Sequence, residues 1–344
     1  MSKNAIHDEE KPPSDDSRTS VRDFLPFSPS KENGKLAVLI SPHLKSLAKK
    51  SKAVHAEFYP SPQEECVSTK SFLDPLMEDQ FVKTRGLVHK YPNRVLIELT
   101  LSCASYCRFC TRRRMVSDIK KLILTEKDVD NMYKYLQSQP DVNEVVISGG
   151  DPFTVPVILK YALQKFNALK SITIIRIHTR VPVSNPHLIK PSFYTTLKQV
   201  KKPLYISIHF EHPDEITKAT VAVINKLKAC GATLLSQSVF LKGVNDDYET
   251  LYKLFRRLPE LGILPYYIYR CDPVAGAEHF IVPFAKELEI MTKLRANLSG
   301  IACPTYVIDT PNGSGKIPVP LNFWEFNKTS FHDFLGKKII VRQN

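Results

Sequence analysis

The sequence lacks a long apolar run, because no stretch approaches the roughly 20 apolar residues that a membrane-spanning helix needs. Its N-terminal segment, MSKNAIHDEEKPPSDD, has neither the basic start nor the apolar core of a secretory signal. The formal net charge of +13 is carried by scattered Lys and Arg, without a basic motif interleaved with aromatic residues. We therefore expect a cytosolic protein that binds neither membrane nor nucleic acid.

Cysteine is scarce and poorly suited to disulfide bonds, since the seven cysteines are odd in number. Cys103, Cys107 and Cys110 stand in the segment LSCASYCRFCTRRR, with three residues and then two between them. Such crowding is typical of metal ligands in a reducing compartment. The others are isolated and are expected to be ordinary thiols: Cys66, Cys230, Cys271 and Cys303.

The composition changes along the chain and indicates four segments. Residues 1–34 are polar and highly charged, which predicts a flexible N-terminal arm. Residues 35–93 contain short helical patterns broken by prolines, which predicts a helical N-terminal cap. Residues 94–320 are expected to form the main domain, and residues 321–344 a short C-terminal tail.

The main domain alternates apolar runs rich in Val and Ile with amphipathic segments of helical period, which predicts a parallel α/β sheet with crossover helices. Six strands are expected, at Arg94–Ser102, Val142–Gly149, Ile172–Thr179, Pro203–Phe210, Thr233–Leu241 and Leu264–Cys271. Glu126–Gln137 and Asp214–Ala229 have the length and period of helices. Six βα units favour an incomplete TIM-like (βα)6 barrel, and a doubly wound open sheet is the alternative.

Polar residues follow the carboxyl ends of the expected strands, where a barrel holds its active site. In strand order these are the three cysteines, Ser148, Gly149, Gly150, Asp151, His178, Arg180, His209, Gln237 and Asp272. Glycine at such a place lets the backbone approach a ligand, and an aspartate can bind an ammonium group. Read alone, however, the sequence GGDP is a turn, and strand ends are commonly polar.

The cysteine segment resembles the signature of radical S-adenosylmethionine enzymes. A [4Fe–4S] cluster usually takes four thiolates, so a set of three leaves one iron open. In that family S-adenosylmethionine occupies the open place, and the element SGGDP binds its methionine amine. Structural zinc is the alternative, but it needs a fourth ligand, and no Cys or His stands in the fifty residues after Cys110.

A second candidate site lies in the segment YVIDTPNGSGKIP, in which Lys316 follows a loop of small residues. A lysine there can form a Schiff base with a cofactor aldehyde. A phosphate-binding P-loop is excluded, because Thr310 stands where its first Gly belongs and Ile317 where Ser or Thr should follow. A plain surface turn is the other interpretation of GSGK.

From about Asp74 to Pro320, about seven-tenths of the chain resembles lysine 2,3-aminomutases. The matching motifs stand in family order: DPLMEDQF, GLVHKYPNRVL, CRFCTRRR, SGGDP, HFEHPDEIT, QSVFLKGVND, PYYIYRCD, GAEHF and the glycine loop. The resemblance implies a radical S-adenosylmethionine barrel that also binds pyridoxal phosphate. It implies an isomerase that moves the amino group of lysine from C2 to C3, which gives β-lysine.

The resemblance also implies the roles of single residues. Lys316 would bind pyridoxal phosphate, and Tyr91, Arg94 and Lys90 would hold its ring and phosphate. Lys90 stands where the family usually has Arg, so it keeps the positive charge but lacks the planar guanidinium that can donate two parallel hydrogen bonds. Arg112 would bind the substrate carboxylate. S-adenosylmethionine would be bound by Ser148, Gly149, Gly150, Asp151, His209 and Gln237. The far ammonium of lysine would be bound by Asp272 and Asp309.

Several alternatives stay open at this point. The two aspartates favour lysine over glutamate, whereas arginine or another amino acid is an alternative substrate. The β-lysine could serve modification of elongation factor P. The alternative outside the enzymes is a non-enzymatic module that binds iron or zinc. A flavodoxin or ferredoxin is the implied electron donor. No cysteine follows Cys303, and Asp247 stands where clostridial members supply a zinc ligand, so we expect no intersubunit zinc and leave homo-oligomer formation open.

Overall fold

The computed structural model describes residues 36–69, 71–116, 124–310, 315–321, 323, 330–332 and 337–340. The arm expected at residues 1–34, most of the tail expected at residues 321–344, and residues 311–314 of the glycine loop lie outside the described residues. The division of the chain at residues 35, 94 and 321 therefore stays a prediction. None of the described helices combines the length and the apolar character that crossing a membrane requires.

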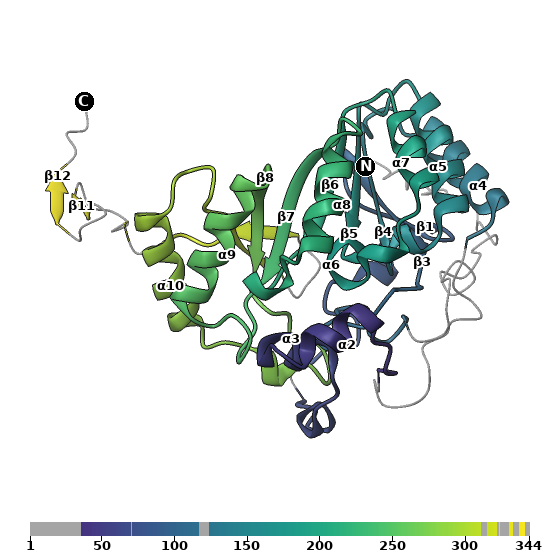
Figure 1. Cartoon of the computed structure of the whole chain (residues 1–344). Coiled ribbons are helices and arrows are strands. Elements are labelled where there is room, and N and C mark those ends of the chain that lie inside the picture. Colours follow the sequence, from purple (N-terminus) through teal and green to yellow (C-terminus); the bar gives the residue numbers. More distant parts are fainter. Residues whose placement is uncertain are drawn as a thin grey trace, which may run out of the picture.

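A curved sheet of ten strands forms the centre of the molecule, and its strands follow one another in chain order (Figure 1). Strands β3 to β9 pair in parallel, whereas β1, β2 and β10 join the two edges by antiparallel pairing. The ten strands are β1 Val82–Thr84, β2 Leu87–Tyr91, β3 Arg94–Thr100, β4 Glu144–Gly149, β5 Ile174–Thr179, β6 Leu204–His209, β7 Thr233–Val239, β8 Ile263–Tyr269, β9 Thr305–Asp309 and β10 Lys316–Pro318.

This topology is that of an incomplete barrel, as the sequence predicts. A doubly wound sheet would reverse its strand order at a switch point, whereas here every parallel strand lies beside its predecessor. Within the described residues the edge strands β1 and β10 do not pair with each other, so the barrel stays open. The six expected strands correspond to β3–β8. The seventh parallel strand, β9, is absent from the prediction because its five residues lie between Pro304 and Pro311 and give no long apolar run.

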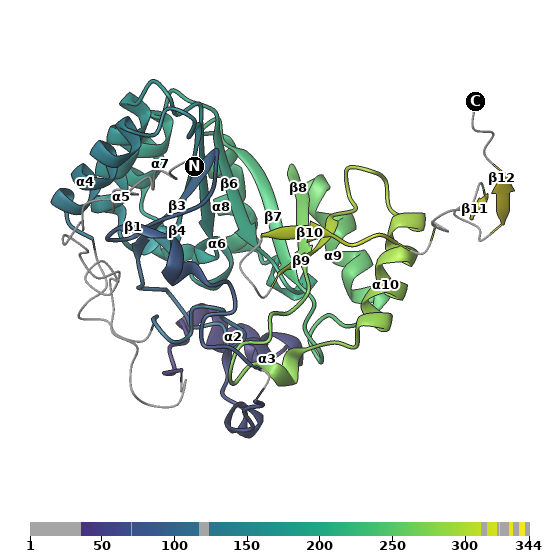
Figure 2. The same ribbon diagram turned by 180° about the vertical axis from the view of Figure 1, so that it is seen from behind.

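Helices cover the outer face of the sheet, with α4, α5, α7 and α8 on one half and α9 and α10 on the other (Figures 1 and 2). Their bounds are α4 Glu126–Gln137, α5 Pro156–Ala168, α6 Val181–Ser184, α7 Pro191–Lys198, α8 Lys218–Lys228, α9 Tyr248–Glu260 and α10 Phe284–Asn297. The expected helix at Glu126–Gln137 is confirmed. Asp214–Ala229 is divided into a short 3₁₀ turn, η6 Pro213–Glu215, and α8, for which Thr217 forms the N-cap.

The segment before β3 differs from the helical cap that the sequence predicts. Its first half is helical, with α2 at Pro42–Ala48 and α3 at Lys52–Phe58. Its second half instead forms β1 and β2, which extend the sheet beside β3. The reason is that Gly86, at φ 74°, turns the chain, and the following Leu87 and Val88 are apolar and buried against the sheet.

Further short elements complete the described chain. They are the 3₁₀ turns η1 Pro62–Glu65, η2 Glu78–Phe81, η4 Pro152–Thr154, η5 Pro186–Leu188 and η7 Glu278–Phe280, and a separate hairpin of β11 Ser330–His332 and β12 Lys338–Ile340.

The alternation of side chains along β3 shows how the sheet separates the core from the site. Ile97 and Leu99 are fully buried and pack in the main apolar core with Met132 of α4. Leu96 lines the cavity described below, and Glu98 forms an ion pair with Arg112 on that same side. Because successive strand residues point to opposite faces, one strand supplies both the core and the site.

Candidate active site

A cavity of about 420 Å³ lies at the carboxyl ends of the parallel strands. Every residue to which the sequence assigns a site role lines it. These residues are Lys90, Tyr91, Arg94, Cys103, Cys107, Cys110, Arg112, Ser148, Gly149, Gly150, Asp151, His209, Gln237, Asp272, Asp309 and Lys316. The fold thus joins groups as far apart in sequence as Tyr91 and Lys316, which are 225 positions apart and in hydrogen-bond contact.

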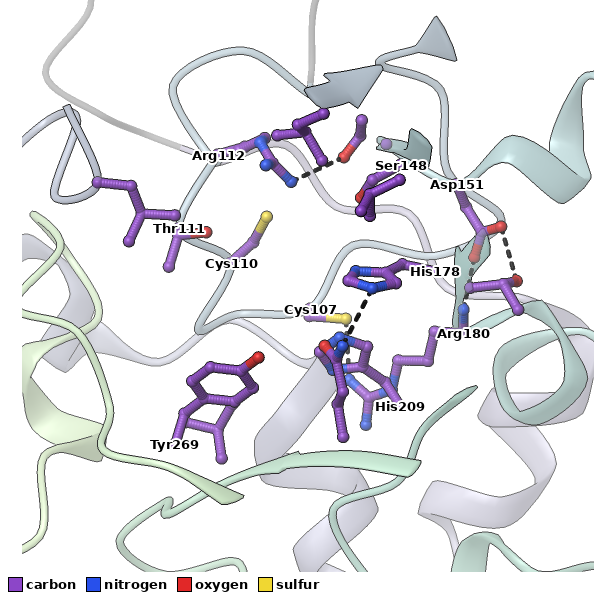
Figure 3. Close-up of a pocket in the computed structure, with 18 of the residues that line it drawn as sticks. Cys107, Cys110, Thr111, Arg112, Ser148, Asp151, His178, Arg180, His209 and Tyr269 are labelled. Atoms are coloured by element: carbon purple, nitrogen blue, oxygen red, sulfur yellow. Dashed lines mark hydrogen bonds between the residues drawn. The ribbon is translucent and has the colours of Figure 1, made fainter. Parts of the chain in front are cut away.

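The cysteines follow β3 on a loop that turns back on itself, because the N–H of Cys110 donates to the carbonyl oxygen of Cys107 at 3.1 Å. Figure 3 shows the thiols of Cys107 and Cys110 between Arg112 on one side and Arg180 on the other. Burial raises the pKa of the Cys103 thiol well above its ordinary value, and that of Cys107 to about 12. A thiolate here therefore needs a cation in contact with it.

The donor set suits a cluster better than a lone metal ion. In the part of the chain that the structure describes, no three His, Cys, Asp or Glu side chains converge as ligands of one ion. A [4Fe–4S] cluster does not require this, because each thiolate binds a different iron.

Arg180, at the end of β5, lies directly behind Cys107. Its Nη1 donates to Sγ of Cys107 at 2.8 Å, and its Nη2 donates to Glu57 and to Oε1 of Glu215, the latter at 2.7 Å. The guanidinium also stacks on the ring of Phe58, at 4.6 Å from the ring centroid. One buried cation therefore connects the cysteine loop with α3 and with the loop after β6.

The glycines after β4 let two loops meet. Gly149 has φ +108°, and a Cβ added to it would lie 2.2 Å from the carbonyl oxygen of Thr100. A Cβ on Gly150 would lie 2.4 Å from the carbonyl oxygen of Ser102. No other residue fits here, so the glycines hold the end of β4 against the start of the cysteine loop.

The carboxylate of Asp151 is fully occupied by donors of the protein. Oδ1 accepts from the N–H of Phe153 and the hydroxyl of Thr179, and Oδ2 accepts from the N–H groups of Arg180 and Val181, all at 2.7–3.1 Å. Burial raises the pKa of Asp151 to about 6, although these four donors stabilise the charged form. Asp151 thereby fixes the ends of β4 and β5 relative to each other.

Two histidines and a glutamine line the cavity from three successive strands. Nε2 of His178 on β5 lies 3.2 Å from Nε2 of Gln237 on β7, and His209 ends β6 between them in the sheet order. Burial lowers the pKa of His178 well below its ordinary value and that of His209 to about 4. Both rings are therefore neutral at pH 7, and each can donate from one nitrogen and accept at the other.

The β9–β10 hairpin places Lys316 beside Asp309. Nζ of Lys316 lies 3.1 Å from Oδ1 of Asp309 and 5.6 Å from the centroid of the Tyr269 ring. The backbone N–H of Lys316 donates to Oη of Tyr91 at 3.2 Å. Gly315, at φ +98°, permits this approach, since a Cβ there would lie 2.8 Å from the same oxygen. The end of the glycine loop thus packs closely against Tyr91.

Asp272, from the segment after β8, lines the same part of the cavity. Burial and, next, the negative charge of Asp309 raise the pKa of Asp272 to about 7, against the opposing effect of Lys316. Two carboxylates and one ammonium group therefore share this end of the cavity, and a second cation placed there would stabilise both carboxylates in their charged form.

Two further basic residues of the cavity, Lys90 and Arg94, stand on the β2–β3 hairpin. The guanidinium of Arg94 stacks on the ring of Tyr91 at 3.9 Å. Nζ of Lys90 donates to the carbonyl oxygen of Leu76 at 3.1 Å. The hairpin register pairs Tyr91 with Arg94, so the two side chains lie adjacent across a tight turn.

Arg112 is held by two glutamates. Its Nε and Nη2 donate to the two carboxylate oxygens of Glu78 at 2.9 and 2.7 Å, and Nε forms an ion pair with Glu98 at 2.9 Å. Nη1 lies 3.4 Å from the carbonyl oxygen of Gly149. Burial, opposed by the charge of Arg112 and helped by the Glu78 carboxylate, raises the pKa of Glu98 to about 7. Glu78 thus fixes the guanidinium through Nε and Nη2, while Nη1 contacts the backbone of Gly149, another residue that lines the cavity.

The chain resembles known enzymes over most of its length. The family model described as the Radical SAM superfamily matches residues 97–255. The L-lysine 2,3-aminomutase of Acetoanaerobium sticklandii is 36% identical over 329 residues, which is 92% of this chain and 79% of that protein. The L-lysine 2,3-aminomutase of Clostridium subterminale is 35% identical over 313 residues, which is 88% of this chain and 75% of that protein. The chain belongs to the lysine 2,3-aminomutase family.

Among solved structures, a radical SAM methyltransferase from Sphaerobacter thermophilus covers 64% of this chain and 68% of its own, at 17% identity and a TM-score of 0.49. Membership of the lysine 2,3-aminomutase family follows from the sequence relatives. It confirms the predicted enzyme class, an isomerase, and implies a [4Fe–4S] cluster, S-adenosylmethionine and pyridoxal phosphate as cofactors.

The residues present fit these cofactors of the aminomutase family. Three half-buried thiols on one loop match a cluster with an open iron, and a lysine amine with aromatic and basic neighbours matches an aldehyde cofactor that carries a phosphate.

Sequence reasoning assigned no role to several cavity residues of this aminomutase. Glu78 stands within the quoted motif DPLMEDQF, so the motif itself was a signal. His178 and Arg180 were noted only as polar strand-end residues. Tyr269 stands in the motif PYYIYRCD and is buried, which raises the pKa of its phenol well above the ordinary value. Glu98 gave no signal, because a single acidic residue within a strand is common on a solvated face.

Proposed function

We propose that the enzyme converts L-lysine into β-lysine by moving the amino group from C2 to C3. One observation carries the proposal: the three cysteines, Lys316 and the pair of Asp272 and Asp309 line the same cavity. When bound, the reduced cluster and S-adenosylmethionine supply a radical that abstracts hydrogen, and pyridoxal phosphate supplies the conjugated system through which nitrogen migrates.

The protein side chains have the following proposed tasks. Lys316 holds the aldehyde of pyridoxal phosphate and releases it to the substrate amine, and Tyr91, Arg94 and Lys90 hold the ring and phosphate. Nη1 of Arg112 binds the substrate carboxylate, and Asp272 and Asp309 bind the ammonium at its far end. Ser148, Gly149, Gly150, His209 and Gln237 would hold S-adenosylmethionine. Asp151 would fix the ends of β4 and β5 instead of binding the cofactor, because four protein donors occupy its carboxylate.

The proposed setting is the cytosol, because the seven cysteines are free thiols and a [4Fe–4S] cluster needs a reducing compartment. A flavodoxin or ferredoxin is the proposed electron donor. Both proposals rest on the chemistry of the cofactors.

The test is anaerobic reconstitution with iron, sulfide and pyridoxal phosphate, followed by incubation with S-adenosylmethionine, dithionite and lysine. We expect β-lysine by mass spectrometry, and no product from arginine or glutamate assayed in parallel. Cys107→Ala should abolish the product, whereas Cys66→Ala, an exposed cysteine outside the cavity, should not. Protein that carries neither an iron–sulfur absorption band nor bound pyridoxal phosphate would contradict the proposal.

A further inference from the structure

The two short helices α2 and α3 lie over the cysteine loop. The N–H of Tyr106 donates to the carbonyl oxygen of Leu39 at 2.9 Å, and the N–H of Arg108 donates to that of Glu57 at 2.8 Å. Cys107 packs against the apolar cluster that the inner faces of the two helices form. Figure 1 shows both helices in purple at the edge of the molecule, below the sheet. A single helical layer, roughly 10 Å thick, therefore lies between Cys107 and this surface.

The outer face of this layer is strongly basic. Between Pro42 and Phe58 the single carboxylate is Glu57, which is fully buried against Arg180. The exposed charges are all positive, and none forms an ion pair with a carboxylate of the described residues. They are Lys45, Lys49, Lys50 and Lys52, which we call the α2–α3 lysine face.

We propose that the α2–α3 lysine face is the docking surface for an acidic one-electron carrier protein that reduces the cluster. This inference rests on the proposed function, which needs one electron from outside: the carrier is oxidised by one electron and the cluster is reduced by one, and no bond changes. The other approach to the cysteines runs through the cavity, which the substrate and two cofactors occupy. A lysine face steers an acidic partner to the helical layer that packs on Cys107, and such contacts are small and short-lived.

The test compares two triple variants with the same change in charge. Lys45→Glu, Lys49→Glu and Lys52→Glu reverse the lysine face. The control variant reverses three exposed lysines of α4 and α5, namely Lys127→Glu, Lys134→Glu and Lys160→Glu. The probe is reduced flavodoxin, and two quantities are measured: the rate of cluster reduction by stopped-flow absorbance, and β-lysine formation with flavodoxin or with dithionite.

We expect the face variant to lower the second-order rate of reduction by flavodoxin at least tenfold at low salt, because electrostatic steering changes association rates by about 10- to 1,000-fold. Reduction by dithionite should be unchanged, which also shows that the variant is folded and carries its cluster. Equal rates for the two variants would overturn the docking proposal. The docking proposal would also be overturned if the face variant lost binding to a DNA duplex while its reduction by flavodoxin stayed unchanged. The lysine face would then bind nucleic acid. Absence of β-lysine with dithionite in the unchanged protein would instead overturn the proposed function, while stopped-flow reduction would still test the docking.

Discussion

Nη1 of Arg180 lies 2.8 Å from Sγ of Cys107, and the same guanidinium binds Glu57 and Glu215. An N–H donor and a positive charge beside a cluster thiolate stabilise the reduced cluster, which carries one more negative charge. The side chain of Arg180 is 9% exposed, so water screens this interaction little. Arg180 thus connects the packing of α3 to the redox properties of the site.

We predict that Arg180→Gln lowers the midpoint potential of the reconstituted cluster by on the order of 60 mV, a tenfold change in a one-electron equilibrium. The measurement is a redox titration followed by electron paramagnetic resonance in the absence of substrate. Arg176→Gln removes the same charge from β5, the strand that Arg180 follows, and Arg176 forms an ion pair with Glu144. The midpoint potential should shift less in Arg176→Gln than in Arg180→Gln.

Arg180→Gln leaves two glutamates without their cation, and loss of one partner of a buried pair costs about 3–5 kcal/mol. Arg180→Lys keeps the charge and is the variant to use if the Gln variant does not fold. The midpoint potential of Arg180→Lys should lie between those of the unchanged protein and Arg180→Gln. Equal potentials in all three would show that Arg180 has only a structural role.

The glycine before Lys316 provides a second prediction. Gly315→Ala meets a backbone at φ +98° and places a Cβ 2.8 Å from Oη of Tyr91, so both Lys316 and Tyr91 must move. We expect the affinity for pyridoxal phosphate to fall at least tenfold, measured by titrating the absorbance of the bound cofactor. Gly243→Ala is the control, because it has φ +77° and nothing within 4 Å of the added Cβ. The same loss in both variants would assign the effect to backbone strain alone.

Much of this site follows from sequence, because it depends on local patterns. The spacing of the cysteines, the polar residues at successive strand ends and the Val- and Ile-rich runs are all readable over a few residues. The contacts that hold the site in shape are not local. Arg112 and Glu78 are 34 positions apart and Arg180 and Cys107 are 73 apart, so no pattern along the chain pairs them. For the same reason the packing of α3 on the cysteine loop became visible only in the fold.

The pair of Glu78 and Arg112 yields a third prediction. Glu78 occupies Nε and Nη2 of the guanidinium, so Nη1 is the nitrogen that Glu78 leaves to a substrate carboxylate. Glu78→Gln removes the charge and weakens this double contact, so the Arg112 fork loses its fixed orientation. We expect KM for lysine to rise several-fold with a smaller change in kcat. Inhibition by 1,5-diaminopentane, which lacks the carboxylate, should stay unchanged, and a parallel loss of that inhibition would contradict a role through Arg112.

The fourth prediction concerns the pH dependence of stability at Asp272. Folding raises the pKa of this carboxyl from 3.8 to about 7, through burial and the neighbouring charge of Asp309. This value already includes a smaller rise from the Glu78 carboxylate and the opposing effects of Lys316 and Lys90. The folded protein therefore binds more protons than the unfolded chain between about pH 4 and pH 7, and its stability falls as pH rises through this range.

Asp272→Asn has no titrating group and avoids this loss, so its advantage should grow with pH. The measured quantity is the melting temperature of the variant minus that of the unchanged protein. We expect this difference to become more positive from pH 5 to pH 8, by at least about 2 °C. A change of roughly 1 kcal/mol produces such a shift in domains of 150–250 residues. Both proteins are measured without cofactors by calorimetry. Asp141→Asn, at an exposed position outside the cavity, should give a difference that does not change with pH. A difference for Asp272→Asn that shrinks with rising pH would show that Asp272 gains a favourable cationic partner on folding, and that the cavity already stabilises its charged form before lysine binds.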